Sequence, residues 1–161
     1  MPIKIPQIIA PSEVTSEVGN LVQLVNALSV PAVGYVEKTD TSAATVTAAE
    51  LTTGRNISVI AMTGNLGAGA TLTLPTVALT VAALQAKFGA AGDVDVVGTS
   101  WLVRVARGGT GSFAWTLTTA TGWGTLAGTL TVTISQWRDF LLTITSATTG
   151  TVQSIGAGDT P

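Results

Sequence analysis

The stretch WLVRVARGGTGSFAWTLTTATGWGTL, residues 101–126, decides the expected fold because apolar and polar residues alternate along most of its length. It holds three of the four tryptophans in the chain and only two charged residues, Arg104 and Arg107. Alternation with a period of two predicts β-strands with one buried face, and the turn sequence GGTGS separates two such strands. The side chains expected on the buried face are Trp101, Val103 and Val105 before the turn, and Phe113, Trp115 and Leu117 after it.

The same pattern continues on both sides of this stretch. Residues 56–62 (NISVIAM) and 71–75 (TLTLP) are expected strands, and two further strands follow, with buried faces at Leu130, Val132 and Ile134 and at Phe140, Leu142 and Ile144. One helix is expected at 76–89, where Val77, Val81, Leu84 and Phe88 recur at helical spacing. The sequence therefore predicts a mainly β protein, an antiparallel β-sandwich or jelly roll with one short inserted helix.

A different kind of segment precedes this β region. Residues 1–11 (MPIKIPQIIAP) alternate prolines with Ile3, Ile5, Ile8 and Ile9, which predicts an extended arm. The arm either pairs with the body of its own chain or reaches onto a neighbouring subunit. Ser12 is a good N-cap for an amphipathic helix that ends before Pro31. Its single apolar stripe consists of Val14, Val18, Leu21, Val25 and Leu28.

These observations predict two regions. Residues 1–47 form the arm, the helix and a linker, a region expected to contact other subunits, and residues 48–161 form the β-sandwich domain. Residues 32–38 (AVGYVEK) within the first region are a possible short strand, whereas 39–54 are interpreted as linker.

The composition restricts the classes of function. Of 161 residues, 46% are hydrophobic but only 10% are charged, against about 25% in an average soluble domain. The net charge of −2 argues against nucleic acid as a partner. The glycines and threonines of the long uncharged stretches argue against a membrane-spanning helix. So low a charge is natural for a subunit that works packed against others.

The sequence offers little chemistry for catalysis. It has no histidine and no cysteine, which excludes histidine acid–base catalysis and the usual zinc sites. Asp93 and Asp95 are an isolated carboxylate pair, and we interpret them as a loop that enters a strand. GNLGAG (64–69) and GGTGS (108–112) are glycine-rich but lack the lysine of a phosphate-binding loop. We expect a protein that is not an enzyme and holds no cofactor or metal.

Exposed tryptophans on a β-sandwich would suggest a binding site for carbohydrate. Trp101 and Trp115 share the phase of their buried neighbours and are expected inside. Trp123 and Trp137 flank turns instead, so they are the candidate glycan contacts.

Residues 48–158 resemble small virion proteins of tailed bacteriophages. The resemblance rests on LTLPT (72–76) before a short helix, and on WRDF (137–140) leading into TSATTGTVQSIG (145–156). It implies a capsid decoration or cement protein, often a trimer, that binds the major capsid protein on the exterior of the virion. A carbohydrate-binding module on a head fibre or on the tail is the alternative.

Overall fold

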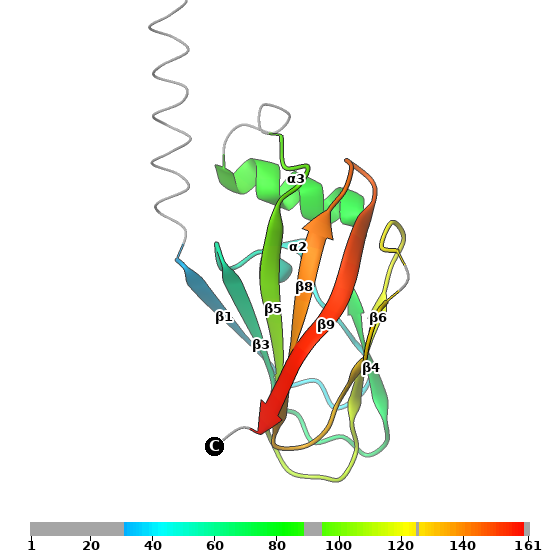
Figure 1. The fold of residues 1–161 in the computed structure, drawn as a ribbon. Coiled ribbons are helices and arrows are strands. Elements are labelled where there is room, and N and C mark those ends of the chain that lie inside the picture. The colour runs from blue at the N-terminus through cyan, green and yellow to red at the C-terminus, as the bar shows by residue number, and fades with distance from the viewer. Residues whose placement is uncertain (1–30, 89–94, 125, 160–161) are drawn as a thin grey trace, which may run out of the picture.

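The computed structural model describes residues 31–88, 95–124 and 126–159 of the chain (Figure 1). This part of the chain is mainly β and contains two sheets and two helices. The strands are β1 (Val33–Lys38), β2 (Ala44–Thr45), β3 (Ile57–Met62), β4 (Ala70–Leu74), β5 (Ser100–Arg107), β6 (Trp115–Thr119), β7 (Thr131–Val132), β8 (Gln136–Ile144) and β9 (Gly150–Asp159). The helices are α2 (Ala48–Leu51) and α3 (Val77–Phe88), and α3 lies across one end of the sheets.

The chain alternates between the two sheets for its first six strands. Strands β1, β3 and β5 enter a five-stranded sheet of order β1-β3-β5-β8-β9, while β2, β4 and β6 enter a four-stranded sheet of order β2-β4-β6-β7. Two successive strands of one sheet are thus connected by a crossover that includes a strand of the other sheet. A crossover brings the chain back to the same end of the sheet, so successive strands run parallel.

Both sheets are therefore mixed, and the prediction of an antiparallel architecture is wrong for four strand pairs. The pairs β1–β3, β3–β5, β2–β4 and β4–β6 are parallel, whereas β5–β8, β6–β7 and β8–β9 are antiparallel. Periodicity shows which face of a strand is buried, but it carries no information on which sheet the strand joins. That is why the sequence did not reveal the crossovers.

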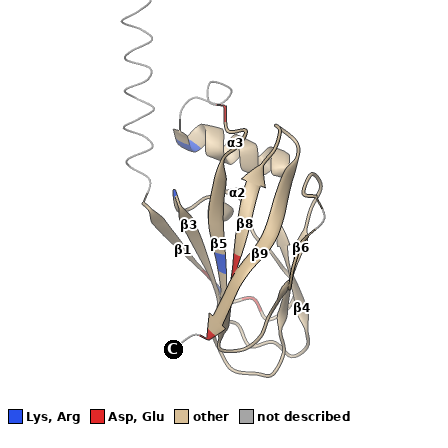
Figure 2. Ribbon diagram, viewed as in Figure 1, with Lys and Arg blue, Asp and Glu red and all other residues tan. Residues whose placement is uncertain are grey.

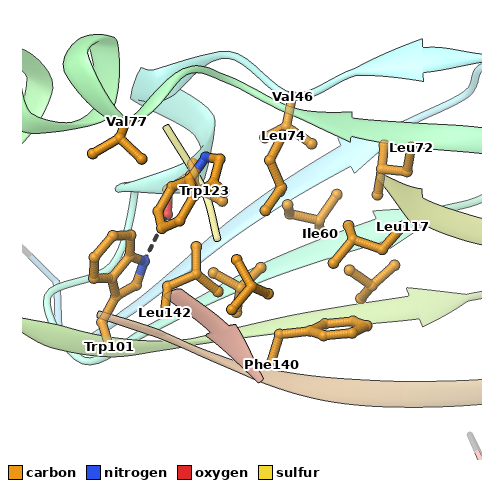
Figure 3. Packing of buried hydrophobic residues seen from close by; sticks show 14 of the residues in the cluster. Val46, Ile60, Leu72, Leu74, Val77, Trp101, Leu117, Trp123, Phe140 and Leu142 are labelled. Carbon is orange, nitrogen blue, oxygen red and sulfur yellow. Dashed lines mark hydrogen bonds between the residues drawn. The ribbon is translucent and has the colours of Figure 1, made fainter. Parts of the chain in front are cut away.

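One hydrophobic cluster joins residues of both sheets and α3. Figure 3 shows Leu72, Leu74 and Leu117 of the four-stranded sheet beside Ile60, Phe140 and Leu142 of the five-stranded sheet. Burying each such side chain contributes about 1.5–3 kcal/mol to folding. The predicted phase is confirmed for Trp101, Val103, Val105, Trp115 and Leu117, which are all buried. The prediction is wrong for Phe113, which precedes β6 and is 43% exposed. Leu130 and Ile134, predicted on another buried face, are only partly buried.

The residues interpreted as linker contain β2 and α2. Thr47 caps α2 with a capping box, in which its hydroxyl accepts from the Glu50 N–H at 3.2 Å. The Glu50 carboxylate in turn accepts from the Thr47 N–H at 2.7 Å. Strands β1 and β2 precede residue 48 and pair with strands that follow it. The helix predicted from its periodicity at 76–89 is confirmed as α3, and the strand predicted at 32–38 is confirmed as β1.

Candidate interaction surfaces

The predicted contact residues of the arm and the apolar stripe lie outside the described residues. They are Ile3, Ile5, Ile8, Ile9, Val14, Val18, Leu21, Val25 and Leu28. The described residues start at Pro31, directly before the edge strand β1.

Trp123, one of the two candidate glycan contacts, belongs to the hydrophobic cluster. Its side chain is buried, and its indole N–H donates to the carbonyl of Pro75 at 2.7 Å. Figure 3 places the ring beside Trp101 and Val77. A ring in this position has no exposed face on which a sugar could stack.

Trp137, the other candidate, lies half-buried on the outward face of the five-stranded sheet. The guanidinium of Arg104 stacks over its ring at 4.0 Å from the centroid. The ring also lies against Gly158 of β9, where a Cβ atom would come within 2.6 Å of Cζ2. Trp137 therefore covers a side-chain-free position of the neighbouring strand and is already stacked with a cation.

The same outward face carries an apolar row that crosses four strands. The register aligns Val33 of β1 with Ile57 of β3, then with Leu102 of β5 and Leu141 of β8. In the next row, Tyr35 pairs with Val59. Val33 is 56% exposed and Tyr35 62% exposed, and Ile155 on β9 adds a further exposed apolar side chain at 51%. We call the set Val33, Tyr35, Ile57, Val59, Leu102 and Leu141 the outward apolar face.

This face also carries charge: Glu37 of β1 shares the phase of Val33 and Tyr35, and one ion pair lies next to the outward apolar face. Arg104 and Asp139 are cross-strand partners, and Nε and Nη2 of the arginine donate to the two carboxylate oxygens at 2.8 Å each. The hydrogen bonds to Asp139 raise the pKa of Arg104 above its usual value. Figure 2 shows the pair as adjacent blue and red segments of β5 and β8. Adjacent Arg138 points to the opposite face and donates to the Thr131 carbonyl.

A second apolar surface is a groove at the end of the four-stranded sheet. Its volume is about 440 Å³, and it is lined by the start of α2, the start of α3 and the strands beside them. Leu79 of α3 lines it and is 59% exposed. The groove contains no charged side chain among its lining residues, which are Thr45, Val46, Thr47, Ala48, Thr73, Leu74, Pro75, Thr76, Leu79 and Ala120.

The residues considered for catalysis do not converge. Asp93 lies outside the described residues, and Asp95 accepts from the N–H of Val97 at 2.9 Å, which closes a local turn. Within the described ranges, no group of three or more His, Cys, Asp or Glu residues is placed to hold a metal ion. No helix in the same ranges is long and apolar enough to cross a membrane.

Comparison of the chain with protein-family models, curated proteins and solved structures finds no match. Function must therefore be inferred from the surfaces themselves. The outward apolar face is the feature that reasoning from sequence missed. The signal for it was present, because β3, β5 and β8 carry apolar residues in both phases, a pattern typical of strands covered on both faces.

Proposed function

We propose that the protein is a structural subunit of a tailed-phage virion, which decorates the capsid exterior as a trimer bound to the major capsid protein. In this proposal the two sheets form a β-sandwich, and the N-terminal arm and helix supply contacts to capsid or sister subunits. A jelly roll is not part of the proposal, since parallel strand pairs are foreign to that architecture.

The observation that carries the proposal is the outward apolar face. It crosses four strands of the five-stranded sheet, and Val33 and Tyr35 within it are more than half exposed. Contiguous exposed apolar surface on a β-sheet is a mark of an interaction site, since a solitary protein would risk aggregation through it. The low total charge supports the same conclusion, because a permanently packed subunit does not need a charged surface to stay dispersed.

Carbohydrate binding receives less support. It rested on Trp123 and Trp137, and the first is a core residue while the second is stacked with Arg104. In the described structure these two rings do not form an exposed surface on which a sugar could stack. We therefore favour assembly over glycan recognition.

Two measurements test the proposal. The first is the mass in solution of the full chain and of Tyr35→Lys, with Leu79→Lys as the matched control. Both positions are exposed and apolar, but only Tyr35 belongs to the outward apolar face. We expect a trimer for the unmodified chain and for Leu79→Lys, and a smaller species for Tyr35→Lys. A monomer for all three proteins would contradict the assembly.

The second measurement is co-sedimentation of the purified protein with empty shells of its cognate major capsid protein. Binding to intact shells, with a stoichiometry set by the lattice, is the expected result. A protein that trimerises but never sediments with the shell would retain the assembly and refute the capsid role.

A further inference from the structure

Arg107, the last residue of β5, is a fully buried cation whose charge has no partner in the described structure. Its side chain is 0% exposed, and neither Nε nor Nη2 makes a hydrogen bond. Only Nη1 donates, to the carbonyls of Met62 and Gly108. A guanidinium cannot shed its proton inside a protein, so a buried arginine needs an anion or a set of acceptors around it.

A second cation in the same row of the sheet, Lys38, has the carboxylate partner that Arg107 lacks. The register places Lys38, Met62 and Arg107 side by side on β1, β3 and β5. The Lys38 ammonium is paired with the Glu50 carboxylate at 3.2 Å. Arg107 has no such carboxylate, although it is the more deeply buried of the two.

Two glycine-rich turns cover the guanidinium. They are residues 63–69 and 108–112, which follow β3 and β5. A Cβ atom at Gly109 would lie 2.7 Å from the Thr63 carbonyl oxygen and 3.0 Å from Nη1 of Arg107. Asn65 ties the turns together, because its Oδ1 accepts from both the N–H and the hydroxyl of Thr110 at 2.9 Å.

Glycine is required at the point where the turns meet. Gly109 has a φ of +79°, a conformation that other residues rarely adopt. The cover over Arg107 at this point is therefore bare backbone, packed too closely against Thr63 and the guanidinium to admit a side chain. Each turn alone lacks the features of a phosphate loop, but the fold brings both of them to one arginine.

We propose that Arg107 anchors a binding site for a small oxyanion, a carboxylate or a phosphate, beneath the turns 63–69 and 108–112. Nε–H and one of the two N–H groups of Nη2, all without a partner, form one edge of the planar guanidinium, which matches two oxygens of such an anion. Entry requires a shift of the 108–112 turn. The oxyanion is either a free ion or a carboxylate of a neighbouring copy of the chain, and the inference does not depend on the virion role.

The burial of Arg107 agrees with a site that needs an anion. Desolvation lowers the pKa of Arg107 below its usual value, which means that the unpaired charge is held at a cost. Arg104, with its carboxylate in place, shows the opposite shift. A bound oxyanion would stabilise the charge of Arg107, as the carboxylate of Asp139 stabilises that of Arg104.

The test is thermal unfolding of the dilute full chain at constant ionic strength, with sodium chloride replaced stepwise by sodium phosphate or sodium acetate. We expect Tm to rise and saturate for the wild type and for the control Arg104→Met, and to stay flat for Arg107→Met. The control removes an arginine that already has a carboxylate. The proposal is overturned if Arg107→Met responds to phosphate as the wild type does.

A second readout covers the case in which Arg107→Met does not fold. The Nε–H signal of Arg107 in a ¹⁵N-resolved NMR spectrum, assigned by its loss in Arg107→Lys, should shift with phosphate and saturate. A signal that does not move in phosphate, acetate or concentrated protein refutes the site.

Protein concentration distinguishes the two sources of the oxyanion. A saturable response to phosphate or acetate in the dilute protein assigns a free ion. A Tm that rises with protein concentration, loses that dependence in Arg107→Met and does not respond to free anions assigns a carboxylate of a neighbouring copy. Neither response in the wild type overturns the inference.

Discussion

Two buried tryptophans, Trp115 and Trp123, differ in whether the indole N–H has a hydrogen-bond partner, and mutation can isolate this difference. The indole N–H of Trp123 donates to the Pro75 carbonyl at 2.7 Å, whereas that of Trp115 is buried without a partner. Replacement of either residue by phenylalanine removes the same atoms from the same cluster. The cavity costs are similar and largely cancel in a comparison of the two variants.

The free-energy effects of the buried hydrogen-bonding groups do not cancel. Trp123→Phe leaves the buried Pro75 carbonyl without its partner, which costs about 1–3 kcal/mol. Trp115→Phe removes an unsatisfied donor and recovers a free energy of the same order, about 1–3 kcal/mol. Trp123→Phe should therefore be less stable than Trp115→Phe by roughly 2–6 kcal/mol.

Urea unfolding followed by far-UV circular dichroism measures this difference without relying on tryptophan fluorescence. Trp101→Phe serves as a control and should behave like Trp123→Phe, because the Trp101 N–H donates to the Leu51 carbonyl at 3.2 Å. The m-values should agree across the series. Equal losses for Trp115→Phe and Trp123→Phe would refute the reasoning.

Three further predictions concern glycine packing beside Trp137, the pH dependence of stability at Glu50 and the salt dependence of capsid attachment. Gly158→Ala places a Cβ atom 2.6 Å from the Trp137 ring and should cost about 1–3 kcal/mol in urea unfolding, whereas Gly156→Ala, at 4.0 Å, should be close to neutral. Burial raises the pKa of Glu50, but the Thr47 N–H and Lys38 outweigh it, so the folded pKa lies below 4.5. Glu50→Gln should thus lower stability by up to about 1 kcal/mol at neutral pH, and pH-dependent unfolding should show the difference vanish as the pH falls through that lowered pKa. Attachment to the capsid, measured by co-sedimentation, should depend weakly on salt, since few charges take part; release at moderate salt would contradict contacts made by the apolar arm.

The sequence was informative wherever a physical property repeats along a single strand or helix. Alternation in residues 101–107 placed Trp101 inside, and helical spacing located α3. Strand pairing was not accessible in this way, since β1 and β3 are joined through β2 of the other sheet. The surroundings of Arg107 were equally hidden. Its phase indicates burial, but the lack of a carboxylate depends on which strands and turns lie beside β5.

The outward apolar face has a consequence for the whole chain. Sheets with parallel strands are usually covered on both faces, often by the helices that connect the strands. Here the crossovers pass through another sheet, and α3 lies across the end of the sheets rather than over that face. Within the described ranges, nothing covers Val33 and Tyr35, which are more than half exposed. A cover for them would have to come from outside the described body, and the apolar stripe predicted between Val14 and Leu28, in the same or a sister chain, has the right character. For this reason we expect the N-terminal region and the outward apolar face to act together in assembly.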